Sequence, residues 1–430
     1  MHSTSASIIE LNDNGAWSCF SDPRAVVHGG RLLVGSVRCG RRRGALDKPA
    51  IGAGNCELII HDLASGSTDV IVLHAALGAE ADASPALLVR PDGRVVALYA
   101  KNAQERCVYW RISESEDLLE WTGEQRLITP GEDSPTGRDH VAFGHAILLP
   151  GEKGRSYHFV RAFARQACCL ISEDHGESWR FGGALLRASG DAELRVQYAS
   201  DGRETIHFVV TEGDAGGCVY HGDLRDGRIF GSDGTVIAHL SEAGEAPVEV
   251  SQLTRVLACE AGSVASVIDV RADAQGRAYG LLAVHKANGQ EMRYHYARWD
   301  GARWVQEAIA HAGQPLGAGA GVACGGAVID PQDPTIVYIS TNADPVSGQA
   351  LTSQADRKRH YELFRGQTAD GGATWAWSAI TEHSSADNLR PIMPPWDDPR
   401  GALVWLRGRY DAEARLWRTE VVGMLESRSG

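Results

Sequence analysis

The sequence predicts an all-β protein built from small, similar sheets, and three observations lead to this fold class. A unit of apolar strand, turn and second apolar strand recurs seven times along the 430 residues. Two segments share a turn pattern that ends in tryptophan. No amphipathic helical pattern of useful length competes with the strand patterns.

The clearest copy of the repeated unit runs from Ser84 to Lys101, where two apolar runs flank the turn Pro91-Asp92-Gly93. Such a turn joins two strands well, because proline fixes φ and glycine accepts a positive φ. The same plan recurs over six further ranges, which are 22–38, 140–161, 195–212, 266–285, 325–342 and 388–407. The units begin about 60 residues apart on average, which is typical of a repeat architecture.

Seven four-stranded sheets arranged radially about an axis form a closed ring, and this arrangement protects the sheet edges. The segment Ser7–Trp17 is predicted to supply the last strand of the seventh sheet and so to lock the ring. The sequence therefore predicts one seven-bladed β-propeller domain over residues 1–430.

The two tryptophan-bearing turns run from Ser172 to Trp179 and from Thr368 to Trp375, and both read S/T-x-D-x-G-x-S/T-W. In this pattern the aspartate is expected to accept backbone N–H groups, glycine to take a positive φ, and the hydroxyl to close the turn. The tryptophan is expected to pack between neighbouring sheets. The pattern resembles the Asp-box hairpin of sialidase-like β-propellers. It supports the fold more than any function, because this turn usually lies away from the catalytic face.

Composition excludes several classes of function. A net charge of −13 disfavours general nucleic-acid binding, which needs a basic field. No apolar run predicts a transmembrane segment or a signal peptide, and the nine cysteines show no metal-binding spacing. We expect reduced core thiols, a cytoplasmic location and no cofactor. The sequence leaves open a structural divalent cation in the axial channel, and it is compatible with a monomer.

The repeat also predicts where a ligand binds. In a propeller each innermost strand starts on the face where the second strand of its blade ends, so residues at these places line one pocket at the axis. The predicted substrate-binding residues at these places are Arg38, Lys101, Asn102, Arg161, Arg195, Glu212, Arg390 and Arg407. His360, in a polar loop of the sixth unit, is added to this set. Cations gathered in an acidic protein indicate an anionic ligand of modest size.

Candidate catalytic residues lie in the same ring. His140, Tyr198 and His285 are candidates for proton transfer, because a neutral histidine exchanges protons near neutral pH. His140 and Tyr198 are predicted to form a base and acid pair on adjacent blades. A ligand carboxylate would be bound by a bidentate arginine, with Arg161 or Arg390 favoured. No HxH or HxxxH pattern predicts a metal site.

Several segments of the chain resemble BNR-repeat proteins of the polysaccharide-lyase type. The segments that carry this resemblance are 85–94, 198–208, 219–222, 359–366 and 387–392. The group includes rhamnose-glucuronate lyases, ulvan lyases and a related α-rhamnosidase family, all on seven-bladed propellers. The resemblance implies cleavage of a uronic-acid-containing oligosaccharide by β-elimination. Arg161 or Arg390 would then neutralise the carboxylate, and His140, Tyr198 or His285 would move protons.

One departure from the group bears on the chemistry. Its members commonly carry histidines at the places that Asp82 and Asn102 occupy in this chain. An aspartate in the pocket is compatible with hydrolysis, in which two carboxylates act as acid and base. The available carboxylates are Asp22, Asp82, Glu212 and Asp214. A glycoside hydrolase on the same substrate class is therefore an alternative, and a non-catalytic propeller that binds a sugar or a protein is another. A true sialidase is disfavoured, because the Arg-Ile-Pro motif of that family is missing.

Overall fold

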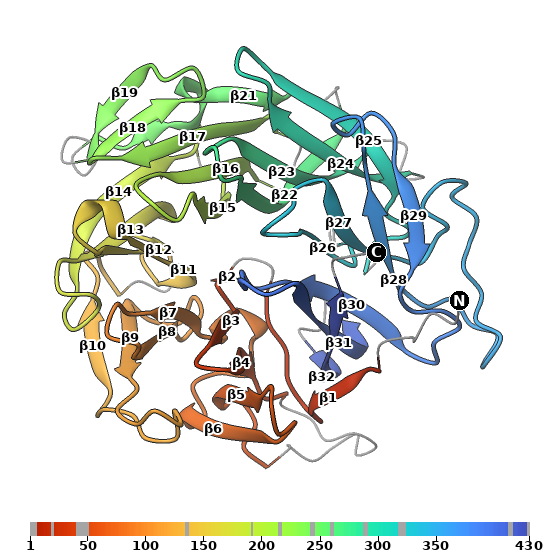
Figure 1. Cartoon of the computed structure of the whole chain (residues 1–430). Helices are drawn as coiled ribbons and strands as arrows, with labels where there is room; N and C mark the ends of the chain where they lie inside the picture. Colours follow the sequence, from red (N-terminus) through yellow and green to blue (C-terminus); the bar gives the residue numbers. More distant parts are fainter. Residues whose placement is uncertain are drawn as a thin grey trace.

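The computed structural model describes residues 7–18, 21–39, 51–133, 137–190, 192–213, 217–240, 246–258, 262–286, 291–316, 324–411 and 416–427. Across these residues, seven sheets surround a central axis (Figure 1). The four main strands of each blade are antiparallel to their neighbours. The predicted seven-bladed β-propeller is confirmed.

The bounds of the strands are as follows. The first two blades contain β3 (Ala25–His28), β4 (Arg31–Val37), β5 (Cys56–Asp62) and β6 (Thr68–His74), then β7 (Ala86–Val89), β8 (Val95–Ala100), β9 (Cys107–Ile112) and β10 (Gln125–Ile128). The third contains β11 (Ala142–Leu149), β12 (Arg155–Ala162), β13 (Gln166–Ser172) and β14 (Arg180–Arg187), joined by the short β2 (Ser21–Asp22) and β20 (Val248–Glu249). The fourth contains β15 (Leu194–Ser200), β16 (Ile206–Glu212), β17 (Val219–Arg225), β18 (Arg228–Gly231), β19 (Val236–His239) and β21 (Thr254–Leu257).

The remaining blades follow the same order. The fifth contains β22 (Val264–Ala272), β23 (Ala278–His285), β24 (Met292–Trp299) and β25 (Trp304–His311). The sixth contains β26 (Ala327–Ile329), β27 (Ile336–Thr341), β28 (Glu362–Gln367) and β29 (Ala376–Ala379), and the seventh β30 (Asp387–Ile392), β31 (Arg400–Asp411), β32 (Leu416–Ser427) and β1 (Ile9–Asn12). Three one-turn 3₁₀ helices are also described, η1 (Ala81–Ala83), η2 (Pro150–Glu152) and η3 (Val250–Gln252). The innermost of the four main strands in the successive blades is β3, β7, β11, β15, β22, β26 or β30. In the third sheet the short β2 and β20 are added at the two edges by parallel pairing.

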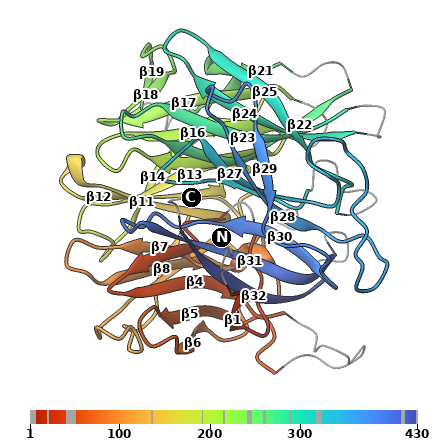
Figure 2. The same ribbon diagram turned by 45° about the vertical axis from the view of Figure 1, so that its right-hand side comes forward.

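The N-terminal strand closes the ring as predicted. Strand β1 pairs antiparallel with β32, with Ile9 opposite Gly423 and Glu10 opposite Val422. The order β1-β32-β31-β30 places this strand at the outer edge of the seventh blade, and Figures 1 and 2 show the four strands as one sheet. The first and last parts of the described chain therefore belong to the same blade, which ties the ring together.

The hydrophobic core lies between neighbouring blades. One cluster joins Leu98 and Trp110 of the second blade to Leu170 and Trp179 of the third, and all four are buried. Burial of one large apolar side chain stabilises a fold by roughly 1.5–3 kcal/mol. Trp405 is fully buried in another cluster, and its Nε1 donates to Asn388 Oδ1 at 2.9 Å. Apolar contacts between blades therefore contribute to the stability of the ring.

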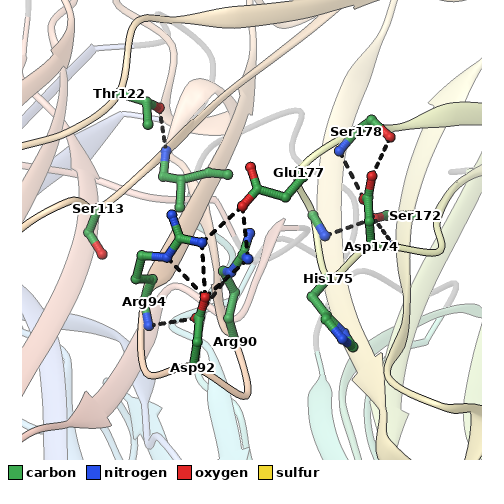
Figure 3. A network of polar contacts seen from close by, with 12 residues as sticks. Arg90, Asp92, Arg94, Ser113, Thr122, Ser172, Asp174, His175, Glu177 and Ser178 are labelled. Carbon is green, nitrogen blue, oxygen red and sulfur yellow. Dashed lines mark hydrogen bonds and ion pairs between the residues drawn. The ribbon is translucent and has the colours of Figure 1, made fainter.

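The two tryptophan-bearing turns have the hydrogen bonds that the pattern predicts. In the first, Ser172 Oγ accepts from Gly176 N at 2.7 Å, and Asp174 Oδ1 accepts from Ser178 N at 2.9 Å (Figure 3). In the second, the corresponding acceptors are Thr368 Oγ1 and Asp370 Oδ1, both at 2.9 Å. The glycines have φ of 91° and 100°. Trp179 packs in the cluster between the second and third blades.

An ion-pair network links the first of these turns to the preceding blade. Arg90 and Arg94, which flank the β7–β8 hairpin turn, both bind Asp92, and each lies 2.9 Å from Glu177 in the turn of the third blade (Figure 3). These contacts add a polar connection to the apolar packing between the two blades.

Two further findings concern the described part of the chain. It contains no helix of the length and apolar character needed to cross a bilayer. Its seven cysteines are free thiols, and Cys19 and Cys259 lie outside the described residues.

Candidate active site

Two carboxylates meet on the face where the innermost strands start. Asp82 lies in η1, directly before β7, and Asn102 follows β8. The Asn102 Nδ2 donates to Glu80 Oε2 at 2.7 Å and to Asp82 Oδ2 at 3.3 Å. Asn102 is buried, so its amide holds the two carboxyl groups side by side. Glu80 was not predicted, although its place two residues before Asp82 could have suggested it.

The environment of Asp82 favours its neutral form. Burial raises the pKa of this carboxyl and is the largest cause, and the neighbouring Glu80 raises it further. A hydrogen bond from Ser18 and the charges of Arg390 and Arg161 oppose the shift without cancelling it. A buried carboxyl with a raised pKa can act as a proton donor.

Three arginines lie close enough for their charges to interact, and we call Arg161, Arg165 and Arg195 the arginine wall. Arg161 is the member whose charge acts on Asp82. Arg161 comes from the end of β12 and Arg195 from the start of β15. Burial lowers the pKa of Arg161 to about 10; the charge of Asp82 opposes this shift, and the charges of the other two arginines add to it. Arg161 also pairs with Glu193 and lies 4.9 Å above the ring of Phe143. Of the predicted cations, Arg161 and Arg195 therefore lie close enough for their charges to interact.

Tyr198 lies next to the arginine wall. Together with Arg161, Phe143 and His145 it lines a small cavity of about 20 Å³. Its ring stacks on Phe159 with centroids 4.1 Å apart, and the His145 ring lies 5.1 Å away. Burial raises the pKa of the Tyr198 hydroxyl well above its ordinary value, so the group stays protonated at neutral pH.

The histidine in contact with Tyr198 differs from the predicted one. The prediction paired Tyr198 with His140, whereas the ring beside it is that of His145. The His140 Nδ1 instead lies 3.0 Å from the carbonyl oxygen of Ala103, next to Asn102. A β-bulge lies in β11 between Ala142 and His145 and changes the direction in which the side chains point. The sequence pattern does not show this bulge.

Arg390 is fixed close to the axis. Its Nη1 donates to the Trp17 carbonyl oxygen at 2.7 Å, and its guanidinium carbon lies 4.2 Å from the centroid of the Tyr410 ring. The backbone of Arg390 has a φ of 53°, a conformation that costs free energy for a residue other than glycine. Its charge acts on Asp82, so this arginine belongs to the same electrostatic environment.

Several other predicted binding residues have partners of their own. Arg38 binds the buried Glu57 at 2.8 Å, and Arg407 binds Glu420 at 2.7 Å across the β31–β32 pair. Glu212 accepts a hydrogen bond from the backbone of Ser189.

The contacts and places of the remaining predicted residues are as follows. The ring nitrogens of His360 lie 2.9 Å from Asp356 and 3.3 Å from Asp387. Lys101 and His285 are half-buried after β8 and at the end of β23. Asp214, a further candidate carboxylate, lies outside the described residues.

A second and larger cavity of about 800 Å³ follows the axis. Its walls come from the innermost strands, and its rim includes turn residues between first and second strands such as Asp201, Asp273 and Asp397. It therefore extends toward the face opposite Asp82. In the described ranges no group of three or more His, Cys, Asp or Glu side chains is arranged to hold a metal ion.

The comparisons with known proteins agree with the architecture. No protein-family model and no curated protein sequence matches the chain. Two solved structures of an ulvan lyase, described as a new polysaccharide lyase family, PL25, cover 96% of this chain and 95% of theirs at 13% identity. Their TM-scores are 0.68 for the complex with -[GlcA(1-4)Rha3S]- and 0.69 for the other structure. An ancestral GH74 enzyme is similar at a TM-score of 0.50 and 14% identity, over 99% of this chain and 48% of its own. At such identities the likeness establishes the fold alone.

Proposed function

We propose that this protein cleaves a uronic-acid-containing oligosaccharide, with a linkage of the rhamnose-glucuronate type, by β-elimination. The observation that carries the proposal is the position of Arg161, which lines a cavity with Tyr198, faces Asp82 and lies beside Arg165 and Arg195. A ligand carboxylate would find a bidentate partner there. The fold shared with an ulvan lyase solved with a glucuronate-containing unit supports the same class of substrate.

The proposed chemistry begins with neutralisation of the uronate carboxylate. Arg161 and Arg195 bind it, and Glu193, which is 36% exposed, gives up its place on Arg161 to the substrate. Neutralisation acidifies the C5 proton, because the negative charge that develops in the transition state is stabilised. A histidine of the site, His140 or His145, accepts this proton. The Tyr198 hydroxyl, kept protonated by burial, donates to the departing glycosidic oxygen.

Hydrolysis is a second candidate, and the contact of Glu80 and Asp82 with one amide favours it. Two neighbouring carboxyl groups, one with a raised pKa, are the arrangement that glycoside hydrolysis uses. In this route Asp82 protonates the glycosidic oxygen and Glu80 serves as base or nucleophile. The substrate class and the role of the arginine wall are unchanged.

The test incubates the protein with glucuronate–rhamnose oligosaccharides and measures two quantities in the same reaction. Unsaturated uronate is measured by its ultraviolet absorbance, and new reducing ends are measured alongside it. Absorbance that rises in step with reducing ends supports elimination. Reducing ends without absorbance support hydrolysis. No change in either signal over a broad panel of uronate oligosaccharides contradicts both and favours a propeller that only binds.

The location and the physical state of the substrate belong to the same proposal. We expect a cytoplasmic enzyme that receives a short, imported anionic oligosaccharide. A measurable cut of the intact polymer would contradict this part of the proposal.

A further inference from the structure

The turn that follows β12 has an unusual backbone. Phe163, Ala164 and Arg165 are consecutive residues with φ of 35°, 58° and 62°. Residues with a Cβ rarely adopt positive φ, and each one costs free energy. Three in succession without a glycine indicate that surrounding contacts hold the turn in this form.

Those contacts come from the segment that carries His140. Asp139 Oδ1 accepts from the Ala164 N–H at 2.6 Å, and its Oδ2 accepts from the Glu132 N–H at 2.8 Å. The Arg165 N–H donates to the Arg138 carbonyl oxygen at 2.8 Å. The turn and this segment thus form one connected wall beside the candidate active site.

The turn presents an apolar ring next to a positive charge. Phe163 is 41% exposed, while the charge of Arg165 acts on Arg161 in the arginine wall. Isolated exposed apolar residues are common on protein surfaces. Phe163 is the first residue of a strained turn, which two hydrogen bonds hold at the edge of the proposed anion-binding site. Keeping the Phe163 ring exposed therefore costs conformational free energy.

We infer that Phe163 and Arg165 form a second sugar subsite, adjoining the place where the uronate binds. The Phe163 ring packs on the C–H face of the neighbouring pyranose, and Arg165 contacts a hydroxyl or anionic group of that sugar. Aromatic rings and a few placed polar groups are the usual lining of small-ligand sites. Asp139 is a positioning residue that sets the turn. This inference rests on the proposed function.

Calorimetry with glucuronate and with a glucuronate–rhamnose tetrasaccharide tests it, with products checked chromatographically in each sample. Phe163→Ala should weaken tetrasaccharide binding about tenfold and leave glucuronate binding within about twofold. Phe163→Trp should retain the tetrasaccharide affinity. Asp139→Ala should weaken tetrasaccharide binding as Phe163→Ala does, with melting temperature recorded to confirm that it folds. Ile128→Ala, on the outer strand β10 and 58% exposed, is the matched control.

The outcomes separate the inference from the proposed function. If the wild type binds both ligands and Phe163→Ala binds the tetrasaccharide equally well, the subsite is refuted and the proposed function stands. If the wild type binds neither ligand, the proposed function is refuted and the subsite falls with it.

Discussion

The stability of this protein should fall in mild acid because of a buried histidine pair between the fourth and fifth blades. The His207 Nδ1 lies 3.2 Å from His221 Nε2, and the other ring nitrogen of His221 lies 2.7 Å from Ser232 Oγ. Trp304 of β25 donates to the same Ser232 oxygen at 2.8 Å. Neutral rings satisfy this chain, and protonation would put a charge into a buried site.

The size of the effect follows from the pKa of His207. Burial is the main cause that lowers this pKa from 6.5 to about 4 in the folded protein. The unfolded chain therefore takes up the proton below about pH 6.5, whereas the folded chain resists it, so stability is lost as pH falls through this window. Between about pH 7.5 and pH 5 the loss from His207 alone is about 2 kcal/mol.

Urea unfolding of the wild type and His207→Gln at both pH values isolates this contribution. Buried Asp223 and Asp269, whose pKa values are raised to about 6 by burial, act in the opposite direction. They are present in both proteins and cancel in the comparison. The wild type should lose about 2 kcal/mol more than His207→Gln between the two pH values. A difference below about 0.5 kcal/mol would show that His207 titrates normally in the folded protein, and the reasoning would fail.

Three further predictions concern the site and the turns. Arg161→Gln should lower kcat/KM on a uronate substrate about 100-fold in a steady-state assay, because a buried charge contact is lost. The control Arg187→Gln, at an exposed ion pair, should have little effect in the same assay. If elimination operates, Tyr198→Phe should lower the rate at least about 100-fold. If hydrolysis operates, Asp82→Asn should abolish cleavage. The paired absorbance and reducing-end assay separates the two reactions. Ser172→Ala should cost about 1–2 kcal/mol in urea unfolding, because the buried Gly176 N–H loses its acceptor, and an unchanged midpoint would contradict the role given to this turn.

The sequence predicts the fold well because the information is local and repeated. Each hairpin needs an apolar alternation and a turn residue, and seven copies make the ring the natural closure. The positions of Asp82 and Asn102 at strand boundaries follow from the same periodicity. The hydrogen-bonded turns at Asp174 and Asp370 also follow, since their bonds join residues at most four positions apart.

The contents of the site are less predictable, because they depend on contacts between side chains of different strands. Arg38 has the right place in the repeat, yet Glu57 on the next strand of the same blade engages it. His145 faces Tyr198 through a bulge that no periodicity shows. Arg165 lies in a turn whose three residues, 163–165, all have positive φ. The turn contains no glycine, so the sequence does not indicate this conformation. Strand ends can be located from sequence, but the partner of each side chain cannot.

Asp82 stands where the resemblance to the polysaccharide-lyase group leads us to expect histidine, and this does not by itself exclude elimination. An ordinary aspartate would be ionised at neutral pH and could not donate a proton. Burial and Glu80 raise the pKa of Asp82, so this carboxyl keeps its proton to a higher pH than an ordinary aspartate does. In the hydrolytic route the acid form of Asp82 is the active one, so activity by that route should decline as pH rises through the folded pKa of Asp82. Burial, the largest cause of the raised pKa, and the opposing charges of Arg390 and Arg161 therefore set the pH range over which Asp82 can donate a proton.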